Sequence, residues 1–183
     1  MSEQMDLTER KLSRVDKFAG RIVTVHVDTV ALPGGGTSTR EVVDHPGGVA
    51  VLALDGENNV LAVIQYRYPF GRTLLEIPAG KLDHPGEDPY EAGLRELKEE
   101  TGAVPGRYEP LGRILPSPGC YGETLHLYLA RDLKMGEQHL DEDEFLNVER
   151  VPFGEMVRRC LDGEIEDAKT VAAVLKAKLL LNL

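Results

Sequence analysis

The chain has 183 residues, 42% of them hydrophobic, which is enough for one domain with its own core but not for two catalytic domains. Its formal net charge is −10, from 31 acidic and 21 basic residues, and it carries no basic block. We therefore expect no nucleic-acid partner, because nucleic acids are bound through positive surfaces. An acidic protein that acted on a phosphate compound would need cations to offset its own negative charge.

The cysteines and the N-terminal residues favour a soluble cytoplasmic protein. Cys120 and Cys160 stand in dissimilar surroundings and form no C-x-x-C pair, so neither a disulfide framework nor a thiolate zinc site is predicted. Residues 1–18 are polar and lack the apolar centre of a signal peptide. A run of about 18 apolar residues, which would predict a membrane helix, does not occur, so we expect no membrane contact.

The first part of the chain predicts a small antiparallel β extension. After a polar start, interpreted as frayed or as a short helix, residues 21–32 alternate valines with polar residues, as half-buried strands do. A glycine-rich turn leads to a second strand at about 39–43. The Pro-Gly cluster that follows indicates a boundary between an extension, residues 1–45, and a main domain, residues 46–183. Such a ribbon is too small to bury its own faces.

The main domain predicts a mixed sheet with helices on its faces. Residues 49–54 and 60–66 are interpreted as a hairpin around a turn at 55–59. Because the further elements do not alternate as βα units, a mixed sheet sandwiched by helices is the favoured α/β class. These further elements are strands at 74–77, 111–115, 124–130 and 145–151 and helices at 153–161 and 168–181.

One helix is signalled at both ends. Asp88 is a suitable N-cap, Pro89 suits the first helical position, Glu91 completes a capping box and Gly102 ends the pattern. At about 100° per residue, one stripe of this helix should face the sheet. The stripe consists of Tyr90, Leu94, Leu97 and Thr101.

Three glutamates in this helix, Glu96, Glu99 and Glu100, lie together beside that stripe. Like charges three or four residues apart on a helix cost about 0.2–0.5 kcal/mol per pair, and Arg95 is expected to pair with only one of the three. Glutamate is a good helix former, so an ordinary solvated face would also explain them. Their position next to the core stripe favours instead a site for a hard cation such as Mg²⁺ with a bound phosphate.

The same residues resemble the Nudix box, whose pattern is G-x5-E-x7-R-E-U-x-E-E-x-G-U, with U an aliphatic residue. The matching positions are Gly80, Glu87, Arg95, Glu96, Leu97, Glu99, Glu100, Gly102 and Ala103. In one respect the chain departs from the pattern, because six residues, 81–86, separate the first glycine from the first glutamate. The extra residue falls in the turn at 84–86, so we expect it to lengthen the loop without rotating the carboxylates.

A wider resemblance, over roughly residues 42–181, is to the ADP-ribose pyrophosphatase branch of the Nudix family. It rests on residues 65–68, 75–80, 117–119 and 141–144, and on Pro118, which follows the box by fifteen residues. The resemblance implies an α/β/α sandwich that hydrolyses ADP-ribose to AMP and ribose 5-phosphate. It also implies Mg²⁺ as cofactor, with Mn²⁺ as a possible substitute.

The resemblance further implies roles for individual residues. Glu96 and Glu100 would bind Mg²⁺ together with the backbone carbonyl of Ala79, and Glu99 would share a second ion. Arg95 would orient Glu99 through a salt bridge.

Several residues outside the helix are candidates for the functional site, and most of them also have a purely structural interpretation. The acidic run 141–144 is either a solvated loop or the source of the general base, with Glu144 ahead of Glu142. Arg67 is either a surface residue at the end of a strand or a fork that contacts the diphosphate or the terminal ribose phosphate region. Glu76 either faces solvent or belongs to the site. The loop residues Pro118 and Gly119 are expected to contact substrate.

Two other functions stay open. A hydrolase of another nucleoside diphosphate sugar, such as ADP-glucose or GDP-mannose, would keep every metal ligand. A Nudix module that only senses a ligand would be expected to lose a metal carboxylate, and none is lost here. Aromatic residues make up only 5% of the chain, so a base would stack on Tyr66, Tyr68, Phe70 or a partner subunit. The resemblance also implies a homodimer that shares the N-terminal ribbon.

Overall fold

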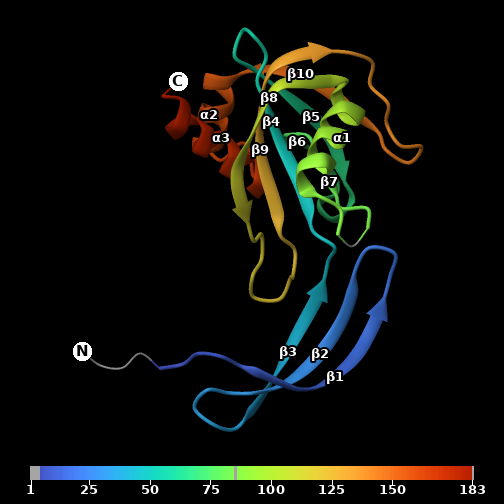
Figure 1. Ribbon diagram of the computed structural model, residues 1–183, viewed down its shortest axis with the longest axis vertical. Coiled ribbons are helices and arrows are strands. Elements are labelled where there is room, and N and C mark those ends of the chain that lie inside the picture. Colours follow the sequence, from blue (N-terminus) through green and yellow to red (C-terminus); the bar gives the residue numbers. More distant parts are fainter. Residues whose placement is uncertain (1–4, 85, 183) are drawn as a thin grey trace. The chain divides into compact units, whose positions relative to one another are not determined.

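The computed structural model describes residues 5–84 and 86–182, and the chain forms two compact units (Figure 1). One unit contains residues 1–46 together with the segment 117–123, and the other contains residues 47–116 and 124–183. Within the described residues, no helix has the length and apolar character needed to cross a membrane.

The first unit is a three-stranded antiparallel sheet in the order β1-β2-β3. Its strands are β1 (Arg10–Ala19), β2 (Thr24–Ala31) and β3 (Thr37–Asp44). The last two confirm predicted strands, but the prediction of a frayed or helical start was wrong for residues 10–19. All ten side chains of β1 are exposed. A strand without a buried face does not need alternating apolar and polar residues, so its sequence lacks the pattern by which strands are predicted. The segment 117–123 joins this unit through Val43, which exchanges hydrogen bonds of 2.8 Å with Cys120 and Gly122.

The second unit holds two sheets. A mixed four-stranded sheet has the order β7-β4-β9-β8, in which β4 and β9 are parallel and the other pairs antiparallel. Its strands are β4 (Gly48–Ala53), β7 (Ala79–Lys81), β8 (Ala103–Ile114) and β9 (Leu125–Met135). An antiparallel sheet has the order β10-β5-β6. Its strands are β5 (Asn59–Arg67), β6 (Arg72–Glu76) and β10 (Leu146–Pro152), and the 3-10 helix η1 (Tyr68–Phe70) joins the first two.

The predicted hairpin of residues 49–66 was wrong, because β4 and β5 belong to different sheets. A single bridge, Leu54 to Val60, connects the two segments. Both edges of β4 are occupied by β7 and β9, so β5 has no edge of β4 to pair with. The turn itself is fixed by Asp55, whose carboxylate accepts hydrogen bonds from the backbone N–H groups of Glu57 and Asn59 at 2.9 and 2.8 Å.

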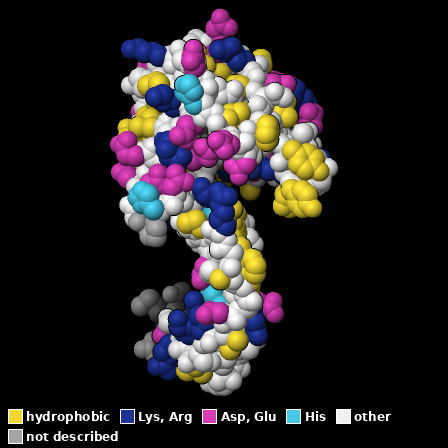
Figure 2. Space-filling model, turned by 90° about the vertical axis from the view of Figure 1, so that its right-hand side faces the viewer, with side chains coloured by type: hydrophobic (Ala, Val, Ile, Leu, Met, Phe, Trp, Pro, Cys, Tyr) yellow, Lys and Arg dark blue, Asp and Glu magenta, His cyan; other side chains and the backbone are white. Residues whose placement is uncertain are grey.

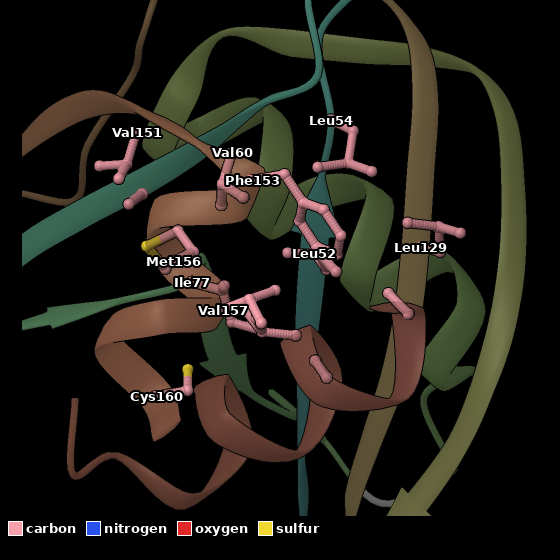
Figure 3. Packing of buried hydrophobic residues seen from close by; sticks show 14 of the residues in the cluster. Leu52, Leu54, Val60, Ile77, Leu129, Val151, Phe153, Met156, Val157 and Cys160 are labelled. Carbon is pink, nitrogen blue, oxygen red and sulfur yellow. The ribbon is translucent and has the colours of Figure 1, made fainter. Parts of the chain in front are cut away.

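Helices cover both faces of the mixed sheet, as predicted. Alternate residues of β4 and of the position after it supply two cores. Leu52, and Leu54 just beyond the strand, pack into the core beneath α2 and α3 (Figure 3), while Val49 and Val51 pack with Leu97 of α1. A strand buried on both faces reads as a continuous apolar run, which is the pattern of this segment. The helices are α1 (Pro89–Thr101), α2 (Phe153–Leu161) and α3 (Ala168–Leu181), and the last two have the predicted bounds.

Helix α1 begins and ends at the predicted residues. The Asp88 carboxylate accepts a hydrogen bond from the Tyr90 N–H at 3.0 Å, and Gly102 ends the helix at a φ of 73°. The predicted buried stripe is only partly correct, since Leu97 and Thr101 are buried but Tyr90 is 39% exposed and Leu94 is half-buried. The buried face is rotated toward the glutamates.

Gly93, in the middle of α1, allows a close approach of Tyr108 from β8. The Tyr108 hydroxyl is buried without a hydrogen-bond partner in the described residues, and it lies 2.1 Å from the position of a Cβ on Gly93. The Tyr108 ring stacks on Tyr128 of β9 with centroids 4.8 Å apart, so it has little freedom to withdraw.

We therefore predict that Gly93→Ala lowers the free energy of unfolding by about 1–3 kcal/mol, because the added methyl overpacks this contact. Gly154→Ala in α2 is the matched control, since a Cβ there meets no atom within 4 Å. The control should be unchanged or up to about 1 kcal/mol more stable through helix propensity. Urea denaturation measures both, and a Gly93→Ala protein as stable as the parent would contradict the prediction.

Candidate active site

Two glutamates of α1 are buried against the segment that contains β7. Glu96 and Glu100 are only 9% and 1% exposed. One carboxylate oxygen of Glu100 accepts a hydrogen bond from the backbone N–H of Ala79 at 3.2 Å. A Cβ on Gly80 would lie 2.0 Å from the Glu96 carboxylate, so only glycine leaves room for that side chain. The glutamates are therefore part of the packed face of the helix, and not merely beside it as the sequence suggested.

Arg95 connects four carboxylates. Its Nη1 lies 2.8 Å from Glu96 Oε1 and 3.0 Å from Glu99 Oε2. Its Nη2 lies 3.3 Å from Glu87 and 3.1 Å from Asp83. The predicted salt bridge to Glu99 is present, but the prediction that Arg95 pairs with only one glutamate was wrong, because a guanidinium carries five donors in a planar fork.

The longer loop before the helix is tied to the same network. The backbone N–H of Asp83 donates to Glu87 Oε2 at 2.6 Å, and Lys81 Nζ lies 2.8 Å from Asp83 Oδ1. The extra residue was predicted in the turn at 84–86, where Pro85 lies outside the described residues. Asp88 caps the helix, and α1 begins at Pro89 as predicted, so the longer loop does not shift the start of the helix.

The buried carboxylates carry raised pKa values. Burial, together with the charges of Glu99 and Glu144, raises the pKa of Glu96 to about 7 despite the opposing charge of Arg95. Burial and the charges of Glu144 and Glu96 raise the pKa of Glu100 to about 9. Both groups therefore ionise less readily than an exposed glutamate unless a positive charge comes close to them.

The donor chemistry of this cluster fits a divalent cation. Carboxylate and carbonyl oxygens are the ligands that Mg²⁺ prefers, and a divalent charge would oppose the effects of burial and repulsion that raise these pKa values. As they stand, Glu96 and Glu100 are occupied by Arg95 and by the Ala79 N–H. Over residues 5–84 and 86–182, no three His, Cys, Asp or Glu side chains are already arranged as a metal site.

A loop that follows β9 is attached to the last turn of α1. The backbone N–H of His139 donates to the Glu99 carbonyl at 2.9 Å, and Gln138 Nε2 donates to the Glu100 carbonyl at 2.5 Å. Gly136 N–H donates to the Gly102 carbonyl at 2.8 Å. These bonds hold residues 136–139, which precede the acidic run 141–144, against the helix.

Glu144, at the end of this loop, lies near the buried glutamates. Its carboxylate accepts a hydrogen bond from Gln65 Nε2 at 3.3 Å. Burial, followed by the charge of Asp141, raises its pKa, and its own charge raises the pKa of Glu96 and Glu100. Glu142 is exposed, which favours Glu144 of the two candidates.

Arg67 and Glu76 form a bidentate pair between β5 and β6. Arg67 Nε and Nη2 donate to the two carboxylate oxygens of Glu76, each at 2.7 Å. The interpretation that Glu76 faces solvent was wrong, since it is 1% exposed. A further partner of Glu76 is Lys169 of α3, which the sequence did not single out because a lone lysine at a helix start carries no motif.

Pro118 and Gly119 are exposed and belong to the other compact unit. Contact of these two residues with substrate therefore stays a prediction.

The outer side of α1 has an open cleft and a charged surface. The cleft has a volume of about 620 Å³ and is lined by Glu91, Leu94, Arg95, Lys98, Glu99, Val104, Pro105 and His139. It therefore includes two predicted site residues but neither of the buried glutamates. Acidic side chains gather around a basic one on one face of this unit (Figure 2).

Comparison with known proteins decides the family. Residues 44–174 match the NUDIX domain, which is most of the chain. The chain belongs to the NUDIX family. The predicted resemblance is thereby confirmed, and the box residues described above are those of a Nudix hydrolase.

Two relatives match nearly the whole chain. A protein of Bacillus methanolicus named methanol dehydrogenase activator is 45% identical over 171 residues, which is 92% of each chain. The ADP-ribose pyrophosphatase of Bacillus subtilis (strain 168) is 41% identical over 170 residues, covering 92% of this chain and 91% of the relative. The crystal structure of an ADP compounds hydrolase matches with a TM-score of 0.85 over 99% of this chain and 97% of that one, and its 22% identity shows the fold alone.

The buried charge of Glu100 should limit stability when no metal is bound. The pKa of this group is about 9 in the folded chain against an ordinary value of 4.5, so the folded state holds the proton more tightly and loses stability as pH rises between those values. We predict that Glu100→Gln unfolds at higher urea than the parent in EDTA. The advantage should grow by about 1 kcal/mol or more from pH 6 to pH 8. A difference that is constant with pH would contradict this assignment of the charge.

Proposed function

We propose that this Nudix chain hydrolyses the pyrophosphate bond of ADP-ribose, giving AMP and ribose 5-phosphate. The observation that carries the proposal is the pair of buried glutamates, Glu96 packed on Gly80 and Glu100 bonded to the Ala79 N–H. Arg95 pairs with Glu96 and with Glu99 of the same box. The substrate is supported by the 41%-identical relative named ADP-ribose pyrophosphatase. In the reaction, water adds across the P–O–P bridge, so each product keeps one phosphate.

Glu96, Glu100 and the Ala79 carbonyl would hold Mg²⁺ or Mn²⁺, with Glu99 sharing a second ion. A bound divalent cation supplies charge neutralisation of the diphosphate and a more acidic water. Gly80 provides the space in which the Glu96 carboxylate sits. Because Arg95 holds Glu96 and Glu99 from the other side, their carboxylates have fixed orientations before substrate arrives.

Glu144 and Arg67 act on the reacting atoms and on the substrate charge. A carboxylate with a raised pKa is a suitable general base, and Glu144 would take the proton of the attacking water. Arg67 uses Nε and Nη2 for Glu76, so Nη1 is not part of that pair and is assigned to the diphosphate.

Other activities remain as tests of this proposal. ADP-glucose and GDP-mannose would use the same carboxylates, so they belong in the same assay. A second candidate, activation of methanol dehydrogenase, is suggested by the name of the 45%-identical relative, and it is compatible with hydrolysis. A module that only senses a ligand is disfavoured because Glu96, Glu99 and Glu100 are all present. The cytoplasmic location stays a prediction.

We also propose that the chain forms a homodimer through its N-terminal extension, residues 1–45. Every side chain of β1 is exposed, and these include Leu12, Val15 and Phe18 at 58%, 54% and 57%. A three-stranded sheet with an apolar face needs a partner surface to bury it. A second copy of the chain can provide this partner surface.

The activity test uses variants of α1. We predict that Glu96→Gln and Glu100→Gln each lower kcat for ADP-ribose by about a hundredfold or more, because each removes charge from the metal site. Glu91→Gln is the matched control, since Glu91 is an exposed glutamate of the same helix. AMP release with Mg²⁺ is measured at saturating substrate. Near-full activity of Glu100→Gln would remove the metal assignment.

The dimer is tested by sedimentation. Two copies of the 20.1 kDa chain should sediment as one species of 2 × 20.1 = 40.2 kDa. We predict that Val15→Asp with Phe18→Asp shifts this species toward the monomer, because the charges would be buried at the interface. Lys17→Asp in the same exposed strand is the control and should remain dimeric. A stable, active monomer of the parent chain would remove the proposal.

A further inference from the structure

The Arg67–Glu76 pair is held from behind by the start of α3. Lys169, which is 8% exposed, forms an ion pair with Glu76 Oε2, the oxygen that also accepts from Arg67 Nη2. Glu76 therefore lies between two cations, one from β5 and one from α3. Such a buried lysine needs a partner of opposite charge to be stable.

The first turn of α3 is itself fixed. Asp167 caps the helix, because its Oδ2 accepts a hydrogen bond from the Thr170 N–H at 3.0 Å, and its Oδ1 lies 2.9 Å from Lys169 Nζ. The Thr170 hydroxyl accepts a hydrogen bond from the backbone N–H of Ile77 at 2.9 Å. Ile77 directly follows Glu76, so the helix start holds both the side chain of Glu76 and the backbone next to it.

The charges in this network are balanced. Arg67 and Lys169 face Glu76 and Asp167, so two positive charges meet two negative ones. Burial alone would raise the pKa of Glu76, but the hydrogen bond from Arg67 and the charge of Lys169 hold it below its usual value. Without Lys169, Glu76 would lose one of the two cations that fix its carboxylate, and the arginine bound to that carboxylate would lose its orientation.

We propose that Lys169 is a positioning residue for substrate binding, which holds the Glu76 carboxylate so that Arg67 keeps its orientation toward the diphosphate. The inference rests on the proposed function, since it needs Arg67 to contact substrate. It assigns a role in the site to a residue outside the Nudix box, which lies 93 positions after Glu76 in the sequence.

The test is steady-state kinetics with ADP-ribose and Mg²⁺. Lys169→Met should raise KM about tenfold and change kcat less than about threefold, because binding is weakened while the box is untouched. Lys169→Arg, which keeps the charge, should recover most of the affinity. Lys178→Met, at an exposed position of the same helix, should leave KM unchanged.

A purely structural role is separated by two further variants. Glu76→Gln with Lys169→Met removes both buried charges and should recover the thermal stability that Lys169→Met loses. KM should stay high, because an amide cannot accept both hydrogen bonds that orient Arg67. Arg67→Ala with Lys169→Met should have the KM of Arg67→Ala alone, within about twofold, because Lys169 acts through Arg67. Thermal unfolding of each variant accompanies the kinetics.

The outcomes distinguish this inference from the proposed function. A raised KM in Arg67→Ala with an unchanged KM in folded Lys169→Met overturns the inference alone. Recovery of KM together with stability in the Glu76→Gln and Lys169→Met double variant also overturns it. An unchanged KM in Arg67→Ala removes the substrate contact assigned to Arg67, and the role of Lys169 falls with it.

Discussion

The site depends on two carboxylates that the fold keeps out of water. Glu96 and Glu100 occupy the packed face of α1, where burial and mutual repulsion raise their pKa values to about 7 and about 9. A hydrophobic residue at either position would remove that electrostatic penalty and stabilise the chain. A divalent cation held by these carboxylates, as proposed above, would gain from the same electric field that costs the folded chain stability. Gly80 completes the arrangement, since any side chain there would displace Glu96.

Basic side chains pair with the other carboxylates around the site. Arg95 gathers carboxylates from α1 and from the preceding loop, while Arg67 and Lys169 share the carboxylate of Glu76. In both places a cation has more than one partner, so its position does not depend on a single contact. An acidic chain of net charge −10 can in this way offer positive groups to an anionic substrate at chosen points.

The sequence predicted local features better than long-range ones. The caps of α1 and the bounds of α2 and α3 follow from local residue chemistry, and all three were correct. The pairing of β4 with β9 was not predictable from its apolar run, because that run fits a hairpin as well as a central strand. Strand β1 has no buried side chain to show its period. The box glutamates were found from spacing and resemblance, whereas Lys169 carries no local signal and needed the fold to bring α3 beside β6.

The loop from Gly136 to Glu144 is bonded to carbonyl groups in the last turn of α1, which have no partner within the helix itself. Fraying of that turn would release the loop, and conversely an intact loop prevents the turn from fraying. The amide of His139 and the amides of the last helical turn should therefore exchange with solvent in one cooperative opening event. If Glu144 is the base, as proposed above, its access to the reacting water would depend on the same local equilibrium that keeps Glu99 and Glu100 in a helix. The end of α1 therefore anchors the loop that leads to Glu144.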